Sequence, residues 1–564
     1  MERAGGFSQT DVFLGEYVVK DSYPQVLVPG SLDILDPEVV YLTSRADGAD
    51  IEIGFFRPAT TDQVPVIVFA SPYIYSGMSP PSDLMNQGEY RRLVLNYVPH
   101  GYAVAFVPVR GTSDAGGCMD LMGPLERADL DQAITWLGEA DWSNGNTAII
   151  GLSYSGSTAW QVAATGNPHL KTIVTVSGVN DWFHLIYKNG TSEERGWGSI
   201  VSSYYTDFGD YNPATGTRSP TNTATAVACP TVAQGIAASE YSLATGERDP
   251  NGFWDDRNQR PGVEANYNGS IFVIQGLLDR NVDPSNAYPW VNQLESRGIV
   301  VKHLLGQWGH EFPDRPDANG NVLRPDTAEI FLHWFDYWLK DNNGSDLGPV
   351  AQVQDNRGHW RSEDAWPPTD AAEKTLYLTP EGRLAANASS QTGQHLIAIS
   401  GHEWFPTSAG GLDEQCLSCA TFTSDVFDQE TRVAGVPRVP VTVVPTTTAG
   451  SIAASLYIVQ GSDREAVGGG AINLRFADGG ETPRDLTPGQ AVVAKMVLEP
   501  LDIVVPSGAQ LELLFHQGSY TDHLPVVPTA PVYLQSGGEQ SVLVLKTFRR
   551  DAADLFEPPV ASIS

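Results

Sequence analysis

The stretch that most constrains the fold is Thr147 to Gly156, TAIIGLSYSG, because it joins three kinds of local structure. The apolar residues Ala148 to Ile150 are typical of the end of a buried strand, and the following STAWQVAATG indicates a helix. Strand, sharp turn and helix form the context of a nucleophile elbow of the G-x-S-x-G type, whose glycines avoid a clash between strand and helix. Such a turn presents its serine hydroxyl at the positive end of the helix. We therefore expect Ser153 to be a nucleophile.

Predicted strands and helices alternate on both sides of this turn. The ranges 64–73 (VPVIVFASPY) and 102–111 (YAVAFVPVRG) are continuous apolar strands of the kind that parallel sheets bury on both faces. Residues 123–142 have apolar positions at helical spacing, and TIVTVSG at 172–178 is a further strand. A hairpin with Asp47-Gly48 at its turn comes before them. This alternation predicts a doubly wound α/β sheet.

The alternation stops between Asn180 and about Tyr267, a segment that is too long for a plain loop. Its helical stretches are interrupted, which predicts an inserted, mainly helical cap over the strand ends. The α/β pattern resumes with SIFVIQGLLD at 270–279 and closes with an amphipathic helix at 327–340.

Short β-rich runs separated by Gly, Pro and Asp occupy residues 349–549, which predicts an all-β sandwich or jelly roll. We therefore divide the chain into three parts. They are an N-terminal extension (1–37), an α/β domain (38–345, with the cap at about 181–267) and a C-terminal all-β domain (346–564).

The charge and the apolar runs exclude two classes of partner. A net charge of −33 argues against nucleic-acid binding, which needs a basic face. No apolar run is long enough to span a membrane, and the start MERAGGFSQT lacks the features of a signal peptide. We expect a soluble chain that is cytoplasmic, or exported if a leader was removed before this numbering. The oligomeric state stays open, with a homo-oligomer among the alternatives.

The four cysteines are too few for a disulfide framework in a chain of 564 residues. Cys416 and Cys419 have CxxC spacing, but a zinc site would need two more ligands. We interpret this pair as part of a loop, with a local disulfide as the alternative. The sequence implies no metal and no cofactor.

A serine nucleophile needs a base, and the base needs an acid to orient it. Asp279 directly follows the predicted strand SIFVIQGLL, and His310 lies in the turn GQWGHEF after the strand VVKHLLG. Both loops leave the carboxyl ends of strands, where sites in open α/β sheets form. Asp283 is the alternative acid. His303, inside a strand pattern, and His333, on an amphipathic helix, are interpreted as structural.

The tetrahedral intermediate of such a reaction also needs hydrogen-bond donors for its oxyanion. The backbone N–H of Tyr154, directly after the nucleophile, is the first candidate. The second should come from the loop after the strand VPVIVFA, where the hydroxyl of Tyr73 can serve. The alternative role of Tyr73 is packing beneath the cap.

Six segments that follow one another in order resemble the Xaa-Pro dipeptidyl-peptidase family (S15) of serine hydrolases and its relatives, the cocaine-esterase-like acylases. They are SPY (71–73), VRGTSDAGGCMD (109–120), WSNGNTAIIGLSYSG (142–156), DWFHLIYKNG (181–190), QGLLDRNVDP (275–284) and GQWGHEF (306–312). The resemblance covers roughly residues 38–345 and, more loosely, the β-rich remainder. It implies an α/β-hydrolase domain with an inserted cap, followed by a C-terminal jelly-roll domain.

The resemblance also implies roles for single residues. Ser153, Asp279 and His310 match the catalytic triad, while Tyr73 and Tyr154 match the two halves of the oxyanion hole.

The substrate pocket is implied in the same way. Two positions match the walls of a proline pocket, one matches a residue near the substrate backbone, and a leucine replaces the tyrosine that the peptidases have three residues after their tryptophan. Two adjacent glutamates in the cap are candidates for holding a substrate's amino terminus. In this order, the residues are Trp182, Val282, Asn281, Leu185, Glu193 and Glu194.

The sequence therefore predicts a serine hydrolase that forms an acyl-enzyme, and first of all an Xaa-Pro dipeptidyl-peptidase that releases N-terminal Xaa-Pro dipeptides. A carboxylic-ester hydrolase or acylase of the cocaine-esterase type is the alternative. A third interpretation is a binding protein whose hydrolase domain is idle. The expected partner is accordingly a peptide or an ester substrate.

Overall fold

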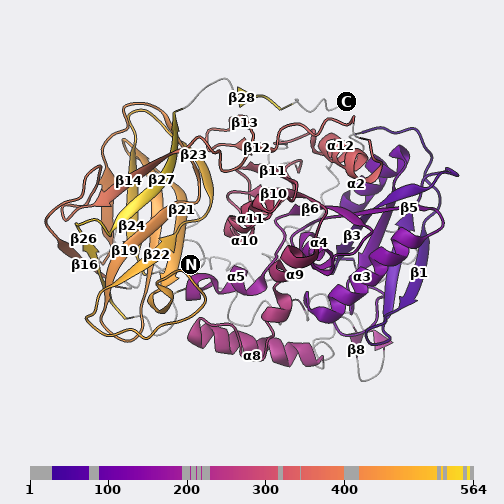
Figure 1. The fold of residues 1–564 in the computed structure, drawn as a ribbon, viewed down its shortest axis with the longest axis horizontal. Coiled ribbons are helices and arrows are strands. Elements are labelled where there is room, and N and C mark those ends of the chain that lie inside the picture. The colour runs from indigo at the N-terminus through magenta and orange to yellow at the C-terminus, as the bar shows by residue number, and fades with distance from the viewer. Residues whose placement is uncertain are drawn as a thin grey trace, which may run out of the picture.

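A computed structural model of the chain describes residues 28–74, 88–193, 204, 211–212, 217–218, 229–315, 322–342, 344–398, 418–517, 523–524, 530–549 and 555–558. Figure 1 shows two bodies side by side: a sheet with helices around it, in indigo to red, and an all-β body in orange and yellow. The expected fold class, an α/β-hydrolase domain followed by an all-β domain, is confirmed.

The first body is built on an 11-stranded sheet with the order β1-β2-β4-β3-β5-β6-β10-β11-β12-β13-β28. Its strands are β1 (Glu38–Thr43), β2 (Asp50–Phe56), β3 (Val64–Ser71), β4 (Ala103–Pro108), β5 (Ser143–Leu152), β6 (Leu170–Val176), β10 (Ser270–Gly276), β11 (Val301–Gly306), β12 (Ala351–Gln354), β13 (Trp360–Glu363) and β28 (Leu555–Phe556).

The central part of this sheet is parallel. All neighbours from β4 through β3, β5, β6, β10 and β11 to β12 run in the same direction. β1 and β2 form the predicted antiparallel hairpin, which joins the sheet through β4. The carboxyl ends of the parallel strands therefore share one edge of the sheet.

Side chains of β3 alternate between two hydrophobic cores, as a strand buried on both faces requires. Val66 and Val68 lie in one core, and Ile67 and Phe69 lie in the other. The first core contains α3 (Pro124–Glu139), α4 (Tyr154–Thr165), α9 (Arg260–Asn266) and α11 (Trp290–Ser296); the second contains α2 (Gly88–Tyr97) and α12 (Thr327–Leu339). The doubly wound sheet is thus confirmed. No helix in the described ranges is both long and apolar enough to cross a bilayer.

The predicted insertion lies between β6 and β10. Its described elements are α5 (Trp182–Ile186), η3 (Lys188–Gly190), β7 (Ser192–Glu193), β8 (Tyr211–Asn212), β9 (Thr217–Arg218), α8 (Pro230–Thr245), η5 (Asp255–Arg257) and α9. Asp181 and Asn258 form an isolated β-bridge that joins the start of the insertion to its end. The long helix α8 lies apart from the sheet in Figure 1, next to the all-β body.

The second body is a 13-stranded antiparallel arrangement around its own apolar core. Its strands are β14 (Ala372–Leu378), β15 (Arg383–Ala385), β16 (Gly393–Ile397), β17 (Ala420–Ser424), β18 (Thr431–Gly435), β19 (Arg438–Pro445), β20 (Ser451–Gln460), β21 (Asp463–Asn473), β22 (Val492–Val497), β23 (Leu501–Val505), β24 (Gln510–His516), β26 (Val532–Ser536) and β27 (Val542–Arg549). One pair departs from the antiparallel rule, because β15 and β17 are parallel.

Strands β12 and β13 lie after the predicted domain boundary at residue 345, yet they belong to the first sheet by their hydrogen bonds. β12 pairs in parallel with β11, and β13 pairs with β12. The sequence pattern could not show this, because a short β-rich run looks the same whichever sheet it joins.

The cap also contacts the all-β body. β7 pairs with β25 (His523–Leu524), and the Asn473 side chain donates a hydrogen bond to the carbonyl of Gly190 at 3.1 Å. A Cβ at Gly190 would stand 2.1 Å from the ring of Phe476, so only glycine permits this approach. The cap is therefore held from two sides, by the sheet and by the all-β body.

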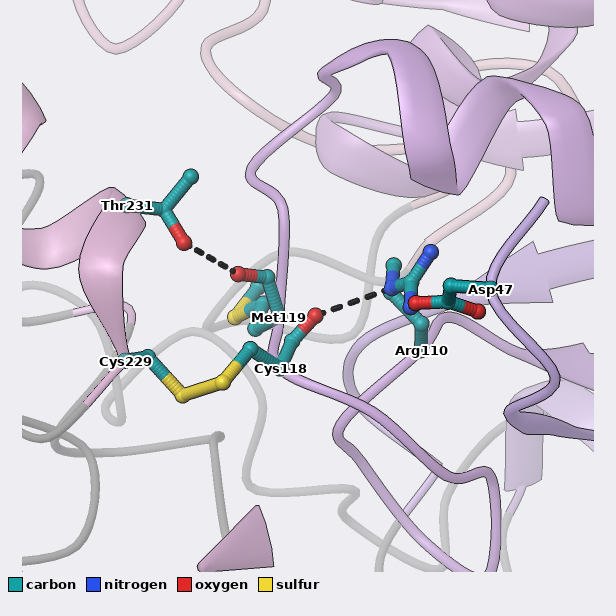
Figure 2. The surroundings of a disulfide bond; sticks show 6 residues. All are labelled: Asp47, Arg110, Cys118, Met119, Cys229 and Thr231. Atoms are coloured by element: carbon teal, nitrogen blue, oxygen red, sulfur yellow. Dashed lines mark hydrogen bonds and ion pairs between the residues drawn. A yellow bond between two sulfur atoms is a disulfide. The ribbon is translucent and has the colours of Figure 1, made fainter. Parts of the chain in front are cut away.

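A disulfide bond between Cys118 and Cys229 joins the loop after β4 to the start of α8 (Figure 2). Arg110 Nε donates to the carbonyl of Cys118 at 2.9 Å, and Thr231 Oγ1 donates to the carbonyl of Met119 at 3.2 Å. The cysteine count gave no expectation of this bond, because its two halves are 111 residues apart in the sequence. Cys419 is also in a disulfide, and Cys416 lies outside the described residues.

Replacing Cys118 and Cys229 together by alanine is expected to lower the free energy of unfolding by about 2–4 kcal/mol, since the bond closes a long loop in the unfolded chain. Urea unfolding monitored by tryptophan fluorescence measures this difference. Dithiothreitol should shift the midpoint of the native protein by more than that of the double variant, in which only Cys419 has a bond to lose. Equal midpoints before reduction would show that the bond does not stabilise the fold.

Candidate active site

The predicted elbow is present, and its strain falls on Ser153. This residue joins β5 to α4 with φ 61° and ψ −126°, a left-handed conformation that costs energy for a residue with a Cβ. Its N–H donates to the carbonyl of Val176 at 2.9 Å, which holds the turn against the neighbouring strand. Ser153 is 5% exposed. In the described part of the chain its hydroxyl makes no capping bond to α4.

The motif departs from G-x-S-x-G in its last position, where Ser155 stands and glycine follows only at 156. The Ser155 hydroxyl donates to Ser71 Oγ at 2.9 Å, beneath the turn. The close approaches fall on Gly151, whose Cβ would stand 2.4 Å from the Ser155 main chain, and on Gly156, whose Cβ would stand 2.7 Å from the Gly151 carbonyl oxygen. The steric reason for glycine on both sides holds, with the second one shifted by one residue.

His310 and Asp279 form a buried hydrogen bond. His310 Nδ1 lies 2.8 Å from Asp279 Oδ2, and the two residues are 7% and 2% exposed. The other carboxylate oxygen, Oδ1, accepts from the N–H groups of Asn281 at 2.8 Å and Val282 at 2.9 Å. These two donors fix the carboxylate so that one oxygen faces the imidazole. With Nδ1–H donated to Asp279, Nε2 is the ring nitrogen that can accept a proton.

The three loops that carry Ser153, Asp279 and His310 leave the same edge of the sheet. Their strands β5, β10 and β11 are parallel, and only β6 separates the first from the other two. The loops that carry Asp279 and His310 are tied together by main-chain hydrogen bonds from the N–H of Leu277 to the carbonyl of Gly306 (2.7 Å) and from the N–H of Leu278 to the carbonyl of Trp308 (3.1 Å).

The alternative acid and bases have other partners. Asp283 accepts from Lys188 Nζ at 3.2 Å, and Lys188 also pairs with Glu499 of the all-β body. Burial by itself lowers the pKa of Lys188, but these two carboxylates outweigh burial and raise it. His303 lies in β11 between Tyr288 and Glu295, at 2.7 Å and 3.0 Å, as its structural interpretation requires.

His333 lies half-buried on α12, on an element that packs against one face of the sheet. That position agrees with its interpretation as a structural residue.

A buried ion pair that the sequence did not reveal supports the loop after His310. Arg92 on α2 pairs with Asp314, and its guanidinium lies 5.5 Å from the ring centre of Phe312. Because an unpaired buried charge is costly, the two partners hold the loop and the helix together. No motif marks these residues, since single charges in a sequence look the same whether they are buried or solvated.

Aromatic side chains form a buried cluster beside the elbow. The Tyr73 hydroxyl lies 3.0 Å from the hydroxyl of Tyr204. The centre of the Tyr204 ring lies 5.4 Å from that of Tyr154 and 5.8 Å from that of Trp182. The cluster also contains Leu185 and Val282. The structure thus brings together five of the predicted residues, the two oxyanion candidates and three from the pocket. Tyr204 was missed, because nothing in its sequence surroundings distinguishes it from other cap aromatics.

The remaining pocket candidates are less defined. Asn281 lies in the loop that carries Asp279, and its N–H donates to Asp279 Oδ1. Glu193 lies in β7, where its main chain is opposite His523 of β25. Glu194 lies outside the described residues. Among the residues that the structure describes, no three His, Cys, Asp or Glu side chains cluster as metal ligands would.

Two family models match the chain, one after the other. Residues 47–311 match X-Pro dipeptidyl-peptidase (S15 family), and residues 341–538 match the X-Pro dipeptidyl-peptidase C-terminal non-catalytic domain. The first match contains the elbow at Ser153 as well as Asp279 and His310.

Several bacteria have related proteins whose names also describe Xaa-Pro dipeptidyl-peptidases. A Streptomyces avermitilis protein, with the provisional name Xaa-Pro dipeptidyl-peptidase, is 27% identical over 493 residues, which are 80% of this chain and 67% of that protein. The Xaa-Pro dipeptidyl-peptidase of Lactobacillus delbrueckii subsp. lactis is 25% identical over 448 residues, 70% of this chain. This chain spans only 53% of the length of the Lactobacillus enzyme.

The fold also matches a solved structure over almost its whole length. A CocE/NonD family hydrolase from Staphylococcus aureus superimposes with a TM-score of 0.70 at 18% identity, covering 92% of this chain and 97% of that one. At this identity the likeness shows the fold alone. The two tandem family matches carry the assignment: the chain belongs to the X-Pro dipeptidyl-peptidase (S15) family of serine hydrolases.

Proposed function

We propose that this chain is an Xaa-Pro dipeptidyl-peptidase that works through Ser153, His310 and Asp279. The observation that carries the proposal is the buried bond between His310 and Asp279, on loops at the sheet edge where the elbow presents Ser153. The names of the relatives supply the class of substrate, a peptide with proline in the second position.

In the first half of the reaction, Ser153 Oγ attacks the carbonyl carbon of the proline residue, and His310 Nε2 takes the hydroxyl proton. Asp279 keeps Nδ1 protonated and stabilises the imidazolium that forms. When the tetrahedral intermediate collapses, the C–N bond breaks, and His310 gives the proton to the departing amine. The dipeptide remains as an ester on Ser153. A water molecule then repeats these steps, so that the dipeptide leaves as an acid and Ser153 regains its proton.

The oxyanion of each intermediate is stabilised by two donors in this proposal, the Tyr73 hydroxyl and the Tyr154 N–H. Both residues belong to the buried cluster beside Ser153, and their rings lie 6.4 Å apart. Charge that develops away from water is stabilised strongly by such fixed donors.

Replacing Tyr73 by phenylalanine is expected to lower kcat by about 100- to 1,000-fold, because one oxyanion donor is lost while the ring remains. Steady-state kinetics on a chromogenic substrate measures it. Tyr204→Phe is the matched control, since it removes only the hydroxyl that bonds to Tyr73 and should cost much less. Equal losses in the two variants would assign the effect to the hydroxyl pair and not to Tyr73.

The pocket for proline is formed in this proposal by Trp182, Val282 and Leu185. All three are buried in the cluster that contains Tyr73 and Tyr154. At position 185 a leucine stands where the peptidases have a tyrosine, so this wall of the pocket has no hydroxyl. Asn281 lies next to Val282 and can contact the substrate backbone. We assign the substrate's amino terminus to Glu193 and Glu194, because a carboxylate is the natural partner of an ammonium group.

The alternative function is an ester hydrolase or acylase with the same nucleophile. The observation in its favour is Leu185, which departs from the peptidase pattern. The third interpretation, an idle site, requires that Ser153 be unreactive.

Two measurements separate these functions. Turnover of Gly-Pro-p-nitroanilide is compared with turnover of p-nitrophenyl butyrate, and Ser153 is labelled with a fluorophosphonate, with Ser153→Ala as the labelling control. We expect release of p-nitroaniline from Gly-Pro-p-nitroanilide and labelling at Ser153. Fast ester cleavage without dipeptide release would replace the peptidase by the esterase, and folded protein that does not label would leave only a binding role.

A further inference from the structure

Glu126 is a fully buried carboxylate that the mechanism above does not use. It lies in the first turn of α3 and is 0% exposed. Its two oxygens lie 2.9 Å and 2.8 Å from the hydroxyl of Tyr154, and Oε1 also accepts from Gln161 Nε2 at 2.8 Å. Its principal partner is therefore the residue that directly follows the elbow serine.

Among the residues that the structure describes, no lysine or arginine forms an ion pair with Glu126. The nearby guanidinium groups have other carboxylates: Arg110 pairs with Asp47 and Asp129, and Arg257 pairs with Asp120. Burial is the main cause that raises the pKa of Glu126, and Asp120 adds to it; with the hydrogen bonds from Gln161 and Tyr154 acting in the opposite direction, the pKa is about 7. A buried carboxyl group of this kind is costly to keep. A position that holds one, with no cationic partner in the described part of the chain, is accordingly a candidate for a function.

The hydroxyl of Tyr154 is fixed by hydrogen bonds both as a donor and as an acceptor. The hydroxyl donates to Glu126 and accepts from the N–H of Met122 at 2.9 Å. Met122 in turn accepts from Trp182 Nε1 through its sulfur, at 2.6 Å. The chain of contacts from Glu126 through Tyr154 and Met122 thus reaches the proposed wall of the substrate pocket.

We propose that Glu126 is a positioning residue of the oxyanion hole, which acts by fixing the phenol of Tyr154 and with it the backbone N–H at 154. This inference rests on the proposed function, in which that N–H is an oxyanion donor. The phenol and the backbone N–H belong to the same residue, Tyr154, which begins α4. If the phenol loses its partner and moves, the first turn of α4 can shift with it. An N–H displaced by a fraction of an ångström loses much of its value to the transition state.

The test compares Glu126→Ala and Glu126→Gln with the native enzyme. Alanine removes the acceptor for Tyr154 and should lower kcat by about 10- to 100-fold, less than the loss of a whole donor, with a smaller change in KM. Glutamine keeps an acceptor oxygen at the same length and should restore most of the activity. Because an oxyanion forms with either substrate, the fold-change in kcat should be alike for Gly-Pro-p-nitroanilide and p-nitrophenyl butyrate.

Tyr154→Phe supplies a double-mutant cycle. If Glu126 acts through the phenol, the variant with both Glu126→Ala and Tyr154→Phe should lose no more kcat than the worse single variant. Additive losses would overturn the proposal.

Asp129→Asn is the matched structural control. Asp129 lies on the same helix, is buried, and contacts Ser44 and Arg110 but not Tyr154. Asp129→Asn should lower stability while leaving kcat per folded molecule unchanged. If Glu126 had a merely structural role, Glu126→Ala would show the same pattern. An unchanged kcat in Glu126→Ala would overturn this inference alone, whereas a native enzyme that neither labels nor turns over either substrate would overturn the proposed function.

Discussion

Replacing Ser153 by alanine is expected to lower kcat by about a million-fold, to the residual rate that binding and the oxyanion donors support without a nucleophile. The elbow strains the backbone at this one residue, so alanine can take the same φ and ψ at similar cost, and the fold should persist. Initial rates on Gly-Pro-p-nitroanilide, with circular dichroism to verify folding, measure the effect.

Ser155→Ala is the control for this change, because Ser155 lies two residues away and its hydroxyl bonds to Ser71 beneath the turn. It should alter stability more than rate. The residual rate of a triad without its nucleophile is expected to be far below one hundredth of the native rate. If Ser153→Ala kept more than about one hundredth of the native rate, Ser153 would not be the nucleophile.

Replacing Asp279 by asparagine is expected to lower kcat by about 10,000-fold. The N–H groups of Asn281 and Val282 both point at Oδ1, so they will select the carbonyl oxygen of the new side chain. The amide NH₂ then faces His310 Nδ1 and donates to it, which moves the ring proton to Nε2. In that tautomer His310 cannot accept the proton of Ser153. A kcat profile over pH, together with nitrogen NMR of the His310 ring, measures both the rate and the tautomer.

Asp283→Asn provides the comparison. Asp283 is also an aspartate of this loop, but it pairs with Lys188. It should weaken the fold and change kcat by less than about ten-fold, because the carboxylate pairs with Lys188. Losses of the same size in both variants would show that the loop, and not its contact with His310, determines the rate.

The sequence predicted most of the fold because its strands are buried on both faces. Continuous apolar runs such as β3 have few other places in a folded chain, and the elbow at Ser153 needs a strand before it and a helix after it. The carboxyl ends of parallel strands meet at one edge, which is why Asp279 and His310 could be placed together from the sequence alone.

Residues that depend on distant partners could not be predicted. The bond between Cys118 and Cys229, the buried pair of Arg92 and Asp314, and the contact of Glu126 with Tyr154 each join segments whose sequences carry no mutual signal. A charged residue on a helix has the same local pattern whether it faces water or the interior. The sequence likewise grouped β12 with the all-β domain, whereas the strand pairs with β11 of the first sheet, because tertiary packing chooses the neighbour of a strand.

The contacts of Glu499 have a consequence for any attempt to isolate the catalytic half. This carboxylate comes from the all-β body, pairs with Lys188, and accepts from the N–H and hydroxyl of Ser285, both at 3.0 Å, just after the loop that carries Asp279. Cutting the chain near residue 345 would remove one of the two carboxylates that pair with Lys188 and would uncover Gly190, which Phe476 contacts closely. A shortened hydrolase would consequently need new partners for Lys188 and Ser285 in place of Glu499.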